Sequence, residues 1–135
     1  MDLSGVKENI QRLFPSLIQT IDSHTEGEPT RLVMSLWDRL PAGDMKEKRT
    51  FFRENLDHVR KLLTREPRGH GGMFVAVVTE PVTGGADFGL IYMDSRRYPF
   101  LCGHATIGAV TSLIETGVIA AGNGEKTVIV DTPSG

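Results

Sequence analysis

The sequence predicts an α+β domain in which a curved, mostly antiparallel sheet wraps around one central buried helix. Two observations give this expectation. Short runs of apolar and β-branched residues occur in pairs separated by turn residues, which is typical of hairpins. After Cys102, apolar residues at helical spacing cover most of a helix surface, which indicates a helix buried in the protein. A chain of 135 residues is long enough to build one core around such a helix.

The N-terminal part predicts a helical arm followed by a hairpin. Residues 1–16 form the expected arm, because apolar residues recur there at three- and four-residue steps until Pro15. These residues are Leu3, Val6, Ile10, Leu13 and Phe14. Segments 17–22 and 31–36 then predict two strands joined by the polar loop 24–29.

A long helix is expected next. Asp44 followed by Glu47 resembles a capping box, which marks a helix start. The apolar stripe of this helix ends before Pro67 and consists of Phe51, Phe52, Leu56, Val59, Leu62 and Leu63. Because the remaining positions are polar, we expect this helix to pack on the outside of the sheet.

The C-terminal part predicts a second hairpin, the central helix and a last strand. Segments 73–79 and 88–93 form the hairpin, joined by a turn rich in glycine and proline. The helix after Cys102 ends near Gly117, and its apolar residues are Ile107, Val110, Leu113 and Ile114. Residues 127–131 form the expected last strand.

Composition favours a small-molecule partner. The formal net charge is −2 and charged residues make up 24% of the chain, so we expect neither nucleic acid nor a membrane surface as a partner. The first thirteen residues include charges and lack the apolar run of a signal peptide. Cys102 is the single cysteine, which fits a reducing, cytoplasmic compartment.

Cys102 directly precedes the expected central helix. Unpaired amides and the helix dipole favour negative charge there, so we expect a lowered thiol pKa and a usable thiolate. The amides of Gly103 and His104 are expected to bind an anion such as a substrate carboxylate. The alternatives are a buried inert cysteine, a glycine that only serves a tight turn, and a histidine that only caps the helix.

Two further features carry open alternatives. His24 and His70 lie in glycine-bearing loops, but their spacing to Cys102 and His104 matches no structural zinc pattern, so no metal is expected. The loop 65–72 combines two arginines, a histidine and three glycines. It either closes over an anionic ligand or is a solvated connection with glycine turns.

Four segments resemble, in order, motifs of the proline racemase family. They are residues 21–31 (IDSHTEGEPTR), 65–70 (REPRGH), 101–108 (LCGHATIG) and 130–135 (VDTPSG). The resemblance runs from about Ile18 to the last residue. It implies the diaminopimelate epimerase type of fold, with two similar domains that each place a curved sheet around a central helix. Residues 17–135 would be the first domain, and the second domain is absent, so we expect a truncated chain.

The resemblance also implies a chemistry. Members of the family are cofactor-independent racemases or epimerases of proline or 4-hydroxyproline, and they tend to be homodimers at full length. By similarity, Cys102 is one of two cysteine bases on opposite faces of the substrate Cα. Gly103 and His104 bind the substrate carboxylate through their backbone. The second cysteine lies in the missing half, so this chain alone is expected to be inactive.

Two other functions remain open. The family includes trans-3-hydroxyproline dehydratases, which carry threonine in place of the second cysteine, at a position outside this chain. The third interpretation is a noncatalytic binding or assembly domain of the same fold. The intact Cys102-Gly103-His104 sequence favours the two catalytic functions.

Overall fold

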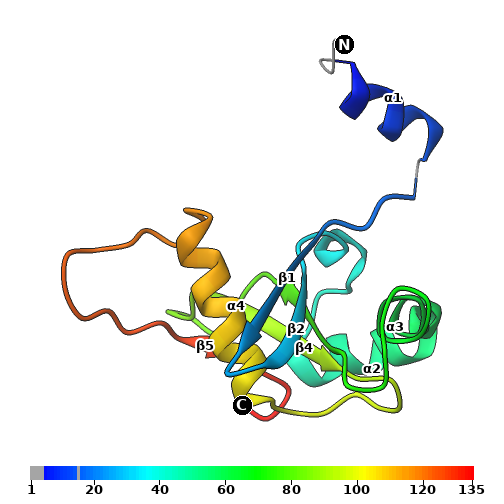
Figure 1. Ribbon diagram of the computed structural model, residues 1–135. Coiled ribbons are helices and arrows are strands. Elements are labelled where there is room, and N and C mark those ends of the chain that lie inside the picture. Colours follow the sequence, from blue (N-terminus) through cyan, green and yellow to red (C-terminus); the bar gives the residue numbers. More distant parts are fainter. Residues whose placement is uncertain (1–4, 15) are drawn as a thin grey trace.

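The computed structural model describes residues 5–14 and 16–135 and contains one five-stranded sheet in the order β1-β2-β3-β4-β5 (Figure 1). The helices are α1 (Val6–Leu13), a 3-10 turn η1 (Trp37–Arg39), α2 (Met45–Asn55), α3 (Asp57–Thr64) and α4 (Gly103–Glu115). The strands are β1 (Thr20–Thr25), β2 (Glu28–Val33), β3 (Phe74–Thr79), β4 (Phe88–Met93) and β5 (Val130–Asp131). The predicted α+β class is confirmed.

The sheet is mixed. The pairs β1/β2 and β3/β4 are antiparallel, with ladders of six and five residue pairs, and they are the two predicted hairpins. The pairs β2/β3 and β4/β5 are parallel, with ladders of four and two residue pairs. Antiparallel pairing therefore carries most of the sheet, and α2 and α3 lie in the crossover between β2 and β3.

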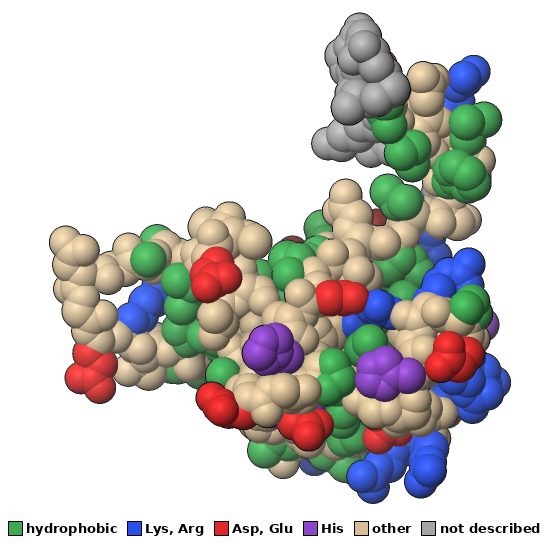
Figure 2. All heavy atoms as spheres, in the orientation of Figure 1, with side chains coloured by type: hydrophobic (Ala, Val, Ile, Leu, Met, Phe, Trp, Pro, Cys, Tyr) green, Lys and Arg blue, Asp and Glu red, His purple; other side chains and the backbone are tan. Residues whose placement is uncertain are grey.

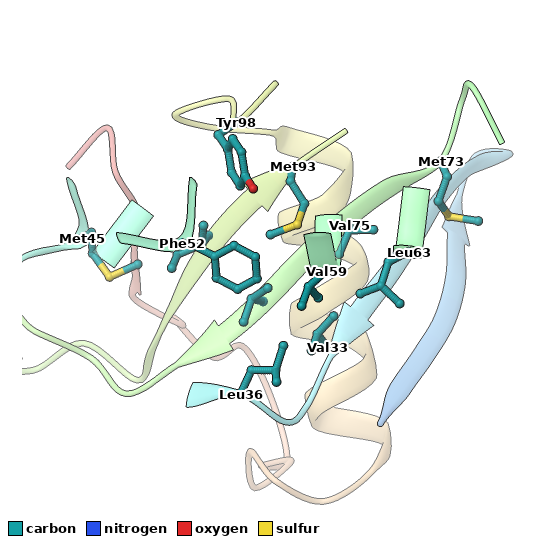
Figure 3. Packing of buried hydrophobic residues seen from close by; sticks show 12 residues of the cluster. Val33, Leu36, Met45, Phe52, Val59, Leu63, Met73, Val75, Met93 and Tyr98 are labelled. Carbon is teal, nitrogen blue, oxygen red and sulfur yellow. The ribbon is translucent and has the colours of Figure 1, made fainter. Parts of the chain in front are cut away.

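Alternation along the central strands gives the sheet two apolar faces. Val75 and Val77 of β3 pack with the side chains of α2 and α3 (Figure 3). Ala76 between them belongs to the cluster that packs under α4. Every residue of β4 is buried, because helices cover the sheet on both sides. The predicted outer position of the helix after Asp44 and the position of α4 on the sheet are thus both found.

The strands of the first hairpin lie closer to its turn than predicted, at residues 20–25 and 28–33 rather than 17–22 and 31–36. The ends of the polar segment 24–29 belong to the strands, which leaves only Glu26 and Gly27 as the turn, with φ values of 50° and 89°. These values suit a two-residue hairpin turn. Pro29 is tolerated in β2 because pairing with β3 begins one residue later, at Thr30.

The predicted long helix is divided in two. The capping box of Asp44 and Glu47 is present at the start of α2 as expected. The helix breaks at Leu56, whose backbone is non-helical (φ −123°, ψ 17°), and α3 begins at Asp57. The sequence has neither proline nor glycine at this point, so the apolar stripe continues across the break and the periodicity predicted one helix.

Helix α4 is buried on one side only. Ala105, Ala109 and Leu113 are buried against the sheet, whereas Ile107 on the outer side is 56% exposed. The predicted burial is therefore found on the sheet side of the helix, because the strands cover only that face. Gly108 allows close packing, since a Cβ there would lie 3.1 Å from Ser23 Oγ.

Helix α1 lies within the predicted N-terminal arm, whereas the last strand is shorter than predicted. Helix α1 stands clear of the sheet, with its apolar residues Ile10 and Leu13 40% and 64% exposed (Figures 1 and 2). Leu3 and Pro15 of the predicted arm lie outside the described residues. Strand β5 has two residues rather than the five predicted.

In the described part of the chain, no helix is long and apolar enough to cross a membrane.

We predict that Gly69→Ala destabilises the protein while Gly71→Ala in the same loop does not. A Cβ at Gly69 would lie 2.5 Å from the backbone carbon of Thr64, whereas nothing lies within 4 Å of one at Gly71. Overpacking against backbone typically costs about 1 to 3 kcal/mol. Urea unfolding of both variants measures the difference. Equal unfolding free energies would contradict the packing described here.

Candidate active site

Cys102 caps the N-terminus of α4 with an extended backbone (φ −147°, ψ 113°) and is half-buried. Its sulfur lies 3.4 Å from Nδ1 of His104, so the two side chains are in contact. The Cys102 side chain makes no capping hydrogen bond, but the nearby backbone amides of Ala105 and His104 act to lower its pKa. The predicted position of the thiol at the start of the helix is therefore present.

The net effect on the thiol differs from the prediction. Burial raises the pKa of Cys102 above its ordinary value, and the carboxylates of Asp94 and Glu28 raise it further. The amides of Ala105 and His104 lower the pKa but do not reverse the effect of burial. Sequence reasoning considered the helix terminus alone and could not include the desolvation caused by the packed domain.

Gly103 and His104 lie beside the sulfur as expected. Gly103 is exposed, and no atom lies within 4 Å of where its Cβ would be, so a ligand can approach its backbone closely. The His104 ring packs edge-on against Phe74, with 5.1 Å between the ring centroids. Its carbonyl oxygen accepts a hydrogen bond from Thr25 Oγ1 of β1.

An open pocket of about 530 Å³ lies between the glycine loop and the segment after β4, and neither Cys102 nor α4 lines it. Gly71, Gly72 and Phe74 line one part of it, and residues 94–97 line another. Phe74 connects the pocket to the ring of His104, and the charge of Asp94 acts on the Cys102 thiol. Phe74 and Asp94 carried no sequence signal, because only the tertiary fold brings the strand ends to the start of α4.

The other histidines support turns rather than the site. His24 Nδ1 accepts a hydrogen bond from the Gly27 amide, and His70 Nδ1 accepts one from the Gly72 amide. His58 is exposed on α3. Among residues 5–14 and 16–135, no group of three His, Cys, Asp or Glu side chains is arranged to hold a metal ion.

The loop 65–72 is anchored by Arg31 of β2. The Arg31 guanidinium pairs with both oxygens of Asp22 at 2.9 and 2.7 Å and donates to the carbonyl oxygen of Leu63. It also donates to the carbonyl oxygen of Arg68 within the loop. Through these hydrogen bonds Arg31 joins the first hairpin, the end of α3 and the glycine loop that borders the pocket.

A charged cluster holds the segment that leads into Cys102. The Tyr98 hydroxyl donates to Asp57 Oδ1, and the Arg49 guanidinium donates to the Tyr98 carbonyl oxygen. Asp57 also pairs with Arg60, which is 5% exposed, at 2.6 Å. The Arg60 guanidinium is the largest influence that holds the pKa of Asp57 well below its usual range. Burial and then Asp57 raise the pKa of Tyr98.

The fold and this arrangement define a class of protein. It is an α+β domain with a thiol and free amides at the start of the helix that packs on the sheet. Such a terminus suits proton transfer next to a bound carboxylate. The chain belongs to the proline racemase family, whose sequence pattern it matches over residues 20–135.

Individual relatives agree with this assignment. The chain is 46% identical over 122 residues to a proline racemase of Clostridioides difficile, covering 90% of this chain and 36% of the relative. It is 37% identical over 116 residues to a trans-3-hydroxy-L-proline dehydratase of Bacillus thuringiensis subsp. konkukian, covering 86% of this chain and 35% of that protein.

The fold is also found in a solved structure. A hydroxyproline epimerase from Agrobacterium vitis, crystallised with bound trans-4-hydroxy-L-proline, superimposes with a TM-score of 0.78 at 23% identity. The match covers 85% of this chain and 34% of the epimerase chain. The chain therefore spans about a third of the length of the proteins it resembles.

We predict that the Cys102 thiol is alkylated by iodoacetamide with a midpoint at higher pH than N-acetylcysteine. Burial outweighs the two amides in setting its pKa, so the thiolate forms later as pH rises. Mass spectrometry of timed samples gives the rate at each pH. Unfolding the chain in guanidinium should move the midpoint down to that of the free thiol. A folded midpoint below the free thiol would overturn this account of the site.

We predict that Asp57→Asn lowers the unfolding free energy by about 2 kcal/mol at neutral pH, because Arg60 is left buried without its charge partner. The folded pKa of Asp57 is depressed, so its contribution is present above the unfolded pKa and lost below it. The difference between wild type and variant should therefore shrink below about pH 4. Denaturant titrations from pH 2.5 to 7 measure it.

Glu54→Gln is the matched control for that substitution. Glu54 pairs with Arg53 in an exposed bridge, with side chains 61% and 49% exposed. An exposed pair of this kind contributes about 0 to 1 kcal/mol. If Glu54→Gln lowered the unfolding free energy as much as Asp57→Asn, the burial of Arg60 would not explain the effect of Asp57→Asn.

Proposed function

We propose that residues 17–135 form the first domain of a cofactor-independent racemase or epimerase of proline or 4-hydroxyproline. The observation that carries the proposal is the position of Cys102. Its sulfur lies at the start of α4, 3.4 Å from Nδ1 of His104, and no atom lies within 4 Å of where a Cβ of the neighbouring Gly103 would be. The family and its relatives support the substrate class, since they include proline racemases and hydroxyproline epimerases.

The reaction needs the substrate carboxylate held against positive dipoles. Removing the α-proton leaves an electron pair that spreads into the carboxylate, and helix amides stabilise the charge that develops there. In the proposed site the amides of Gly103 and His104 bind the carboxylate. They act without pyridoxal phosphate or a metal.

Proton transfer then needs one acid and one base on opposite faces of Cα. In one direction the Cys102 thiolate takes the α-proton and becomes a thiol, while the second cysteine of the complete protein gives a proton to the other face. In the other direction Cys102 is the acid. The raised pKa keeps the thiol protonated for the acid role, and the amides of Ala105 and His104 favour the thiolate for the base role.

A dehydratase is the second candidate function. The relatives include trans-3-hydroxy-L-proline dehydratases at 37% and 36% identity. In that reaction Cys102 removes the α-proton, the C3–O bond breaks, and the hydroxyl group leaves as water with a proton from an acid. The same thiol serves both reactions, and the residue on the opposite face decides between them.

Two further properties belong to this proposal. The complete protein is expected to form a homodimer, as family members do. The proposed chemistry also needs Cys102 as a free thiol, which favours a reducing compartment such as the cytoplasm.

The test uses the protein expressed from its complete open reading frame in D₂O. L- and D-proline, both epimers of 4-hydroxyproline and trans-3-hydroxy-L-proline are supplied separately. A racemase or epimerase incorporates deuterium at Cα and yields the opposite configuration, whereas a dehydratase consumes only the 3-hydroxy substrate. NMR and chiral chromatography follow both outcomes. Absence of exchange with all five substrates would reject the proposal.

We predict that Cys102→Ser lowers the exchange rate by about 100-fold or more, the usual contribution of a positioned acid or base. His58→Gln is the control, because His58 is exposed on α3 and far along the chain from the site. Circular dichroism should show both variants folded. Unchanged exchange in the Cys102 variant would remove this residue from the mechanism.

A further inference from the structure

Two carbonyl groups in the first turn of α4 accept hydrogen bonds from side chains. The Cys102 carbonyl oxygen accepts from the Thr106 amide at 3.0 Å and from Thr106 Oγ1 at 2.8 Å. The His104 carbonyl oxygen accepts from Thr25 Oγ1 at 3.0 Å, across from strand β1. The start of the helix thus accepts side-chain hydrogen bonds both from the helix itself and from the sheet.

The Thr106 hydroxyl is itself hydrogen-bonded to a tyrosine of the sheet. Its oxygen lies 2.6 Å from the hydroxyl of Tyr92, which is 0% exposed near the end of β4. Since the Thr106 hydrogen is donated to the Cys102 carbonyl, the Tyr92 hydroxyl must donate to Thr106. The result is a directed chain from the buried sheet to the residue that carries the sulfur.

Each of these carbonyls belongs to a peptide unit at the start of α4. The Cys102 carbonyl shares its peptide with the amide of Gly103, a residue with open space where a Cβ would be. The His104 carbonyl shares its peptide with the Ala105 amide, which acts to lower the pKa of the Cys102 thiol. A hydrogen bond to a carbonyl fixes the peptide plane and polarises the N–H of the same unit.

We propose that Thr25 and Thr106, the latter supported by Tyr92, are positioning residues that orient the amides of Ala105 and Gly103 toward the sulfur and the substrate carboxylate. This inference rests on the proposed function of Cys102. Thr25 acts on the peptide that faces the sulfur. Thr106 acts on the peptide that faces the carboxylate.

A purely structural role for the same hydroxyls is the alternative. Threonine in a helix often bonds to the carbonyl four residues earlier, as Thr106 does, and this alone satisfies its hydroxyl. The relay from Tyr92 and the separate bond from Thr25 are not needed for that purpose. A test must therefore measure the effect of the amides on the reactivity of Cys102 rather than the stability of the protein.

The first experiment measures alkylation of Cys102 by iodoacetamide across pH in the 135-residue chain. Thr25→Val keeps the side-chain shape and removes the hydroxyl, so the Ala105 amide stabilises the thiolate less. We expect the profile to move to higher pH, with roughly threefold slower alkylation below the midpoint. Thr25→Ser should restore the wild-type rate, and Thr111→Val, on the exposed side of α4, should leave it unchanged.

The sign of the change separates positioning from loss of structure. Burial raises the pKa of the Cys102 thiol, so unfolding or loosening moves the alkylation profile to lower pH. Loss of the Thr25 hydroxyl alone moves the profile to higher pH. A profile that is unchanged, or that moves down, overturns the role of Thr25. Circular dichroism identifies a variant that does not fold, and Thr25→Ala then repeats the test.

The second experiment compares iodoacetate with iodoacetamide, because iodoacetate carries a carboxylate. An oriented Gly103 amide draws that carboxylate to the sulfur, so the ratio of the two rates at Cys102 should exceed the ratio for N-acetylcysteine. Thr106→Val and Tyr92→Phe should lower this ratio about twofold to threefold, with Thr106→Ser restoring it. A ratio that does not change in either variant overturns the role of Thr106.

Failure of this inference and failure of the proposed function give different results. If the hydroxyls do not position the amides, the alkylation profiles of the variants match wild type while the complete protein still exchanges deuterium. If Cys102 is not a racemase or dehydratase base, the complete protein shows neither exchange at Cα nor consumption of trans-3-hydroxy-L-proline that depends on Cys102, whatever the alkylation profiles show.

Discussion

The close packing of α4 on the sheet is the contact on which the rest of the structure depends. Small residues make it possible, because Ala105 and Ala109 are fully buried and Gly108 lies against Ser23 and Thr30. Larger side chains here would push the helix away from the strands. The close approach also brings the start of the helix within hydrogen-bonding distance of β1 and β4. The position of the cysteine therefore follows from packing along the whole helix.

Opposed electrostatic effects meet at the cysteine. Burial beside the sheet disfavours the thiolate, and the amides of the first helical turn favour it. In the described domain burial prevails, so the pKa of the thiol is raised above its ordinary value.

Support for the site comes from three parts of the chain that are distant in sequence. Strand β1 supplies Thr25, β4 supplies Tyr92, and the cluster around Asp57 fixes the segment before the cysteine through Tyr98. Arg31 joins the first hairpin to the glycine loop beside the pocket. These contacts are made by hydroxyls and charged groups whose partners are far along the chain, so no local pattern predicts them.

The sequence by itself determined the elements and the cysteine at the helix start. Hairpins, the capping box at Asp44 and the helix after Cys102 follow from local periodicity and turn residues, and such signals act over a few neighbouring residues. The exact strand bounds of the first hairpin and the break at Leu56 did not follow from it, because polar edge strands and an uninterrupted apolar stripe hide them.

Only the tertiary structure decided the direction in which the thiol pKa shifts, the one-sided burial of α4 and the hydrogen bonds to its first turn. The physical reason is common to all three. Desolvation, coverage of a helix and hydrogen bonds between distant strands depend on which surfaces are brought together, and that information is distributed over the whole chain rather than written at any one segment.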